Sequence, residues 1–97
     1  MIEKERIIEV LKTVEDPDLY LDIYFLGLIY EIHTFEDNSI KIVMTFTTPL
    51  CPAAPEIIAE IKEKVLKIDN VSKIDIEVVY KPKWEPNMEV KQMLGLV

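Results

Sequence analysis

Hydrophobic residues recur at helical spacing in two stretches of the chain. Residues 3–14 carry one apolar stripe, formed by Ile7, Val10, Leu11 and Val14. Residues 53–68 carry a second stripe, formed by Ile57, Ile58, Ile61, Val65 and Ile68. Pro17 is expected to end the first helix, because the residue before a proline avoids the α-helical region. The pattern therefore predicts two amphipathic helices, the second closing at Asp69-Asn70.

Three other stretches alternate apolar and polar residues, which is the pattern of half-buried β-strands. They span residues 28–35, 39–47 and 73–80. The turn sequence Glu36-Asp37-Asn38-Ser39 joins the first two, so they are predicted to form an antiparallel hairpin.

The predicted order is α-β-β-α-β. Because each helix and each strand has one apolar face, we expect an α+β fold. It would be a two-layer sandwich with both helices on one face of a small mixed sheet. If the second and third strands are neighbours, they run parallel and the helix between them crosses over. The whole chain, 1–97, is expected to be one domain, with an irregular C-terminal tail at 81–97 that includes a short helix.

The charge balance argues against several classes of partner. The 97 residues include 11 basic and 18 acidic side chains, for a net charge of −7. Such a surface repels phosphate groups, so we expect no nucleic-acid partner and no membrane binding. The single cysteine rules out an intramolecular disulfide and a self-contained zinc finger. Without a disulfide framework or a leader, the protein is expected to be cytoplasmic.

The densest chemical signal is the segment Thr45-Phe46-Thr47-Thr48-Pro49-Leu50-Cys51-Pro52. A strand ends there, hydroxyl groups gather, and the lone cysteine comes just before a helix. Pro52 suits the first helical position, which would make Cys51 the N-cap. The positive end of the helix would then favour its thiolate, the form that attacks electrophiles and binds soft metals. The alternative, a small buried hydrophobic side chain, stays open.

Three other places carry candidate residues. Asp16-Pro17-Asp18-Leu19 is either a turn after the first helix or a pair of carboxylates close to Cys51. The only histidine, His33, is expected to be solvated near the hairpin turn, away from Cys51. Trp84, between two prolines, is predicted to cover the core, to wall a cleft beside Cys51, or to anchor a partner.

Taken in order, these motifs resemble a known family. Besides Asp16-Pro17-Asp18-Leu19 and the segment 44–52, they include Leu26-Gly27-Leu28-Ile29-Tyr30, Pro82-Lys83-Trp84 and Leu94-Gly95. The chain resembles the MIP-18-like, or SufT/PaaD-like, iron–sulfur cluster assembly factors, long called a domain of unknown function. The resemblance implies an α+β, non-catalytic accessory factor in cluster assembly or delivery, with Cys51 as functional thiol in a shallow site lined by Asp16, Asp18, Leu19, Thr47 and Thr48. In one departure, the family usually has glutamate where this chain has Asp18.

The ligand count limits what such a factor can hold. One thiolate per chain cannot hold a cluster that takes about four protein ligands. We therefore expect a transient cluster or iron in labile contact with Cys51, shared with a scaffold, a client, a small thiol or the second subunit of a homodimer, and no stable cofactor. The alternative is an interaction adapter of a maturation or multi-subunit oxygenase complex, in which Cys51 is structural. A thiol enzyme is disfavoured, because the sequence offers Cys51 no evident base.

Overall fold

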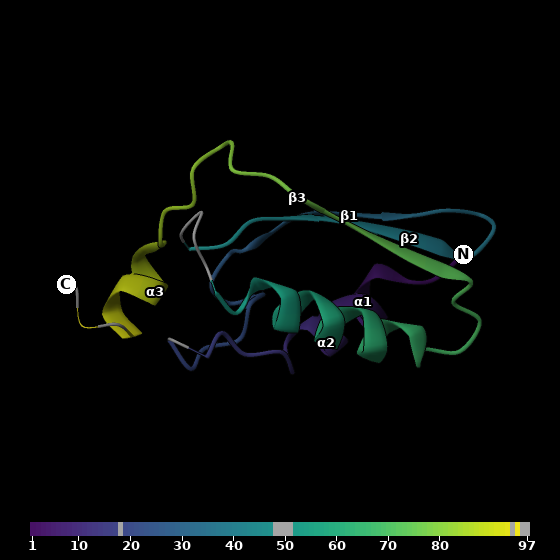
Figure 1. Ribbon diagram of the computed structural model, residues 1–97, viewed down its shortest axis with the longest axis horizontal. Helices are drawn as coiled ribbons and strands as arrows, with labels where there is room; N and C mark the ends of the chain where they lie inside the picture. Colours follow the sequence, from purple (N-terminus) through teal and green to yellow (C-terminus); the bar gives the residue numbers. More distant parts are fainter. Residues whose placement is uncertain (18, 48–51, 94, 96–97) are drawn as a thin grey trace.

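In the computed structural model, a three-stranded sheet lies over two helices that cover one of its faces (Figure 1). The structure describes residues 1–17, 19–47, 52–93 and 95. In chain order the elements are α1 (Lys4–Leu11), β1 (Ile29–Thr34), β2 (Ser39–Met44), α2 (Ala54–Leu66), β3 (Lys73–Val78) and α3 (Met88–Met93). The predicted α+β sandwich and the order α-β-β-α-β are confirmed.

The sheet has the order β1-β2-β3 and is mixed, as predicted. β1 runs antiparallel to β2, and β3 runs parallel to it, with α2 as the connection between β2 and β3. Ile42, in the central strand, lies between Ile32 and Ile76. The register of β1 shifts between Ile29 and Glu31, so the simple alternation expected for residues 28–35 is interrupted by a β-bulge.

The core fills the space between the sheet and the helices. β2 contributes more to it than either edge strand, because a central strand is covered along both of its sides. The largest fully buried side chains come from α1, the segment after it, β2, α2 and α3: Ile7, Leu11, Val14, Ile23, Leu26, Leu28, Ile40, Ile42, Met44, Ile61, Val65 and Val90. The apolar stripes predicted for the two helices therefore face the sheet.

Both helices are shorter than predicted. α1 ends at Leu11 with Lys12 as its C-cap, well before Pro17. The amides of Thr13 and Val14 bond to carbonyls three residues back, which tightens the chain and still buries Val14 in the core. Pro17 therefore does not end the helix.

α2 begins at Ala54 with Ala53 as its N-cap, so the prediction of Cys51 at the N-cap and Pro52 at the first helical position is wrong. Pro55 stands in the first turn instead. A first-turn proline is tolerated because the first helical N–H groups have no partner within the helix. Pro52 and Pro55 both satisfy this rule, so the sequence alone does not show which of them lies in the first turn of α2. Cys51 itself lies outside the described residues.

After β3 the chain continues as an irregular segment and then forms α3. Val90 of α3 is fully buried, and Trp84 packs against the core cluster. The molecule measures 43 × 24 × 22 Å along its principal axes, so it has two well-separated ends. Across the described residues, no helix combines the length and the apolar character needed to cross a membrane.

Candidate functional site

Different segments of the chain lie at the two ends of the molecule's long axis (Figure 1). We call one the turn end, defined by the β1–β2 turn at residues 35–38 and the loop after α2. We call the other the site end, defined by the segment 12–28, residues 45–47 after β2, and the tail from residue 79. Most of the candidate residues that the structure describes lie at the site end.

Asp16 organises the loop after α1. Its side chain is fully buried, and its Oδ1 accepts a hydrogen bond from the amide of Leu19 at 3.2 Å. Its backbone accepts from the amide of Tyr20 at 2.8 Å and donates to the carbonyl of Leu21 at 3.0 Å. Glu15 and Asp22 form an isolated antiparallel bridge just outside these bonds. The carboxylate thus fixes a tight loop, as aspartate side chains do in Asx turns.

The tail is attached to this end by Trp84. Its indole Nε1 donates to the carbonyl oxygen of Leu26 at 2.7 Å, a bond that spans most of the chain length. Nearby, the hydroxyl of Tyr30 donates to the carbonyl of Pro82 at 2.8 Å. Gly27 has a φ of +77°, while a Cβ there would lie 4.0 Å from the indole nitrogen, an ordinary contact. Glycine is therefore required at 27 for the backbone turn and not for space.

A cavity of about 240 Å³ opens where β2 ends and the tail begins. It is lined by Thr45, Phe46, Thr47, Tyr80, Lys83 and Trp84. Two threonines and one lysine give it polar groups, while the three aromatic residues supply apolar surface. Such a mixture suits a partner side chain or a small polar molecule better than a bare metal ion.

The structure brings some of the predicted site residues together. Thr47 and Trp84 line the same cavity, and Asp16 and Leu19 share a hydrogen bond. Asp18, Thr48 and Cys51 lie outside the described residues, so their roles stay predictions. Among residues 1–17, 19–47, 52–93 and 95, no group of three or more histidine, cysteine, aspartate or glutamate side chains is placed to hold a metal ion.

The only histidine of the chain lies away from the site end. His33 lies on the exposed face of β1 near the turn end, where its Nε2 is 3.2 Å from Glu31 Oε1. This agrees with the solvated position predicted for it.

The sequence did not single out Phe46 and Tyr80 as lining residues. The only sequence signal for them is the alternating pattern, which continues for two residues beyond the end of β2 to Phe46 and beyond the end of β3 to Tyr80.

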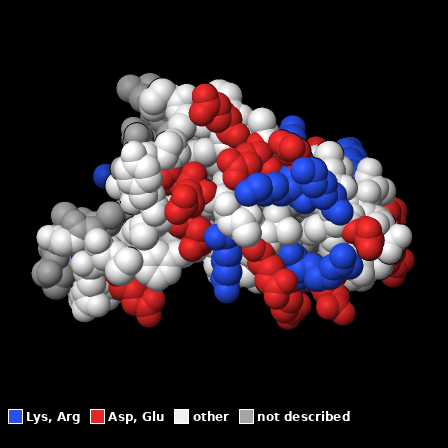
Figure 2. All heavy atoms as spheres, turned by 90° about the horizontal axis from the view of Figure 1, so that it is seen from below, with Lys and Arg blue, Asp and Glu red and all other residues white. Residues whose placement is uncertain are grey.

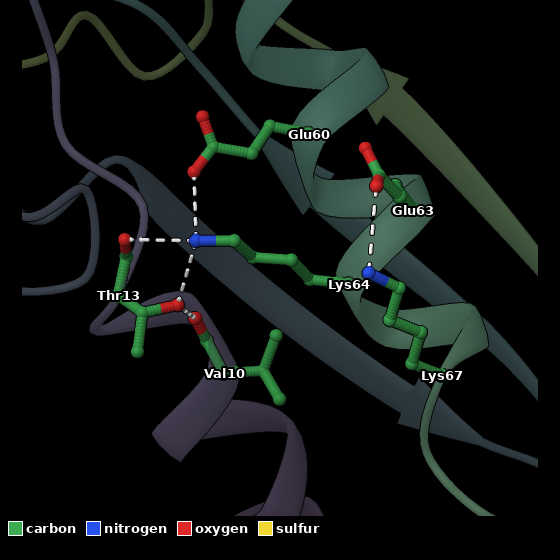
Figure 3. A network of polar contacts seen from close by, with 6 residues as sticks. All are labelled: Val10, Thr13, Glu60, Glu63, Lys64 and Lys67. Carbon is green, nitrogen blue, oxygen red and sulfur yellow. Dashed lines mark hydrogen bonds and ion pairs between the residues drawn. The ribbon is translucent and has the colours of Figure 1, made fainter.

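A larger hollow, of about 370 Å³, lies between α1 and α2 and is lined in part by Arg6, Lys64 and Lys67. Lys64 Nζ donates to the carbonyl and hydroxyl oxygens of Thr13, each at 3.2 Å, and pairs with Glu60 at 2.9 Å (Figure 3). Lys67 pairs with Glu63 at 3.5 Å. Both carboxylate partners belong to α2, so of these contacts only the bonds from Lys64 to Thr13 fasten α2 to the segment that follows α1.

The chain matches a family model described as "Iron-sulfur cluster assembly protein" over residues 4–78. That range holds α1 to β3 and leaves the tail with Trp84 and α3 outside. The match confirms the resemblance drawn from the sequence motifs.

Named relatives point the same way. An "Fe-S protein maturation auxiliary factor" of Porphyromonas gingivalis is 36% identical over 85 residues, covering 88% of this chain and 81% of the relative. The "Fe-S protein maturation auxiliary factor SufT" of Staphylococcus aureus is 32% identical over 75 residues, covering 77% of this chain and 85% of the relative. Among solved structures, a conserved hypothetical protein of Thermotoga maritima superposes with a TM-score of 0.86 and 36% identity, covering 97% of this chain and 95% of that one.

Proposed function

This chain belongs to the iron–sulfur cluster assembly protein family, and from that membership we propose that it is an auxiliary factor in the maturation of iron–sulfur proteins. The observation that carries the proposal is the family match over residues 4–78, together with the names of the relatives. Those relatives are named auxiliary factors, which supports a non-catalytic role. The cluster is then cargo, destined for a client protein.

We assign the functional thiol to Cys51. It is the only cysteine of the chain, and iron–sulfur clusters are held mainly by cysteine thiolates. In sequence it stands four residues after Thr47, which lines the site-end cavity, and two before Ala53, the N-cap of α2. The polar and aromatic lining of that cavity supports a role in receiving a partner at a place close in sequence to the thiol.

One thiolate is too few for a stable cluster, so contact with the cargo is transient. The described residues add no cluster of metal-ligating side chains to it. The remaining ligands must come from a client, a scaffold protein, a small thiol or a second copy of this chain. Anaerobic addition of iron and sulfide to the pure protein tests this limit. A stoichiometric cluster on a monomer, formed without added thiol, would contradict it.

Cys51→Ser tests the assignment of the thiol. In a host strain lacking this gene, the variant is expected to leave the activity of an iron–sulfur dehydratase as low as the deletion does, while the wild-type chain restores it. The amount of dehydratase polypeptide should stay constant, because the defect lies in cluster delivery. The melting temperature of the variant serves as the control for folding.

The second candidate function is an interaction adapter in which Cys51 is structural. The polar and aromatic lining of the site-end cavity favours it, because such a surface can receive a partner side chain without any metal ligand. Full restoration of dehydratase activity by Cys51→Ser would establish the adapter and exclude cluster contact through the thiol.

A further inference from the structure

Tyr20 has a backbone conformation that its residue type disfavours. Five described residues have positive φ angles: Gly27, Gly95, Asn38, Asn70 and Tyr20. Glycine lacks the Cβ that makes this region costly, and the short polar side chain of asparagine tolerates it. Tyr20, at a φ of 57°, is the exception among them, and an aromatic residue gains nothing from the left-handed region itself.

The loop enforces this conformation from both sides. The Tyr20 amide donates to the carbonyl of Asp16, and the Asp16 amide donates to the carbonyl of Leu21, so Asp16 is bonded both to Tyr20 and to the residue after it. The Asp16 carboxylate also holds the Leu19 amide. A residue kept in a strained region by its surroundings is typical of functional loops.

The side chain of Tyr20 does not offset this strain by packing. The residue is 76% exposed, more than any other large hydrophobic residue in the described part of the chain. Glycine or asparagine at position 20 would relieve the strain and expose less apolar surface. The tyrosine is therefore explained by a contact outside the chain and not by folding.

We propose that Tyr20 anchors a basic surface of the partner protein with which this factor works, an inference that rests on the proposed function. The loop sequence from Glu15 to Asp22 contains four acidic residues and no lysine or arginine. On the face that carries the helices, acidic side chains occur along the whole length, while most basic ones lie in the middle and toward the turn end (Figure 2). An arginine or lysine of the partner can stack on the exposed ring and approach the exposed carboxylate of Glu15 or the half-buried one of Asp22. Tyrosine is among the residues that most often dominate binding energy at interfaces.

Tyr20→Gly tests the proposal because stability and function should move in opposite directions. We expect the melting temperature to rise by about 4 °C, since glycine removes the strain. Restoration of dehydratase activity in the deletion strain should fall roughly tenfold, as for loss of an interface anchor. Asn70→Gly is the matched control at the turn end: the melting temperature should change by about 1 °C, and activity should stay at the wild-type level.

Tyr20→Trp and Tyr20→Phe keep a ring for stacking and should retain most of the activity, whereas Tyr20→Asn should behave like Tyr20→Gly. A Tyr20→Gly chain with full activity would overturn the inference. If that chain is active while Cys51→Ser is inactive, the proposed function stands and only the anchor is lost. If loss of the gene leaves dehydratase activity unchanged, the proposed function itself fails.

A photoreactive phenylalanine analogue at position 20 tests the chemistry of the partner. In cells it should crosslink to protein segments rich in lysine and arginine, and the crosslinks should disappear when salt is raised in extracts, because screening weakens charge pairing. The same analogue at Phe35, an exposed aromatic at the turn end, is the control and should not give these crosslinks. Crosslinks from position 20 to acidic segments or to nucleic acid would overturn the basic-partner assignment.

Discussion

The turn end and the site end of this molecule use their residues differently. At the turn end, positive φ angles fall on Asn38 and Asn70, and the carboxylate of Asp37 bonds to its near neighbour Ser39. At the site end, a positive φ falls on Tyr20, and the carboxylate of Asp16 is fully buried. Departures from local preference are expected where function, and not folding, selects the residue.

The hydrogen bonds that close the β1–β2 turn join residues close in sequence, whereas the bond that holds the tail joins residues far apart. Ser39 and Asp37 are sequence neighbours, whereas Trp84 reaches back across most of the chain to Leu26. The β1–β2 turn is therefore closed by local bonds, to which Ser72, from the loop after α2, adds longer-range bonds to the carbonyls of Asp37 and Asn38. The site end needs the tail in place, so a change in the tail should damage it without disturbing the hairpin.

Trp84→Ala should have the largest effect. It removes the hydrogen bond to Leu26 and the packing of a half-buried indole on the core, at a cost of about 3 kcal/mol. Trp84→Phe keeps a ring but loses the N–H donor, and should cost about 1 kcal/mol. Urea unfolding followed by circular dichroism measures both, because either variant removes the only tryptophan and its fluorescence.

The same variant tests whether the ends are independent. Amide chemical shifts should change for residues near Leu26 and stay constant for the β1–β2 turn. If Trp84→Ala costs no more than about 1 kcal/mol, or if the turn shifts as much as the site end, the tail does not hold the site end.

The fold was predictable because its signals are local and repeat along the chain. Ile40 and Ile42 alternate with Ser39 and Lys41, and Ile57, Ile61 and Val65 keep helical spacing. Each pattern therefore identifies both the element and its buried face. Helix ends were predicted less well. Pro17 and Pro52 both permit a boundary, but the chain turns earlier in one case and later in the other.

The arrangement of the site was less predictable for a physical reason. Trp84 was singled out as a candidate, but nothing in its neighbourhood of the sequence names Leu26 as its partner. The positive φ of Tyr20 runs against residue preference, so no propensity rule could anticipate it. Both features arise from tertiary contacts, and both lie at the site end.

Lys64→Met should have a smaller effect, away from both ends. The methionine keeps the apolar stem of the side chain but loses two kinds of contact. The bonds from the lysine Nζ to Thr13 join α2 to the segment after α1, and the ion pair with Glu60 lies within α2. Because the lysine is partly exposed, solvent screening limits the loss to about 0.5–1 kcal/mol. Lys67→Met, which breaks only an exposed pair with Glu63, is the control and should change stability by less than about 0.3 kcal/mol. Urea unfolding in dilute buffer and again in about 0.5 M salt measures both variants. At the higher salt the Debye length is about 4 Å, so screening should narrow the stability difference between them.

Ser39→Ala should have the smallest effect, and it bears on the claim that local bonds close the β1–β2 turn. The Ser39 hydroxyl donates to Asp37 Oδ1 at 2.6 Å, and the Ser39 amide donates to the same atom at 3.0 Å. These bonds favour the carboxylate and hold the pKa of Asp37 below its usual 3.8. Because the folded-state pKa is lowered, the stabilisation is present above the unfolded pKa and is lost as pH falls through the folded one.

Removing the hydroxyl should raise the pKa of Asp37 toward its usual value, which an NMR titration of the carboxyl carbon measures. The acid-side loss of stability should then become shallower, because the folded and unfolded pKa values lie closer together. Ser72→Ala is the control: its hydroxyl donates to the backbone carbonyl of Asp37 and not to the carboxylate, so the titration should stay as in the wild type. An Asp37 titration that moves with Ser72→Ala but not with Ser39→Ala would show that the longer-range bond from Ser72, and not the local bonds from Ser39, sets the state of the carboxylate, and the contrast between the two ends would fail.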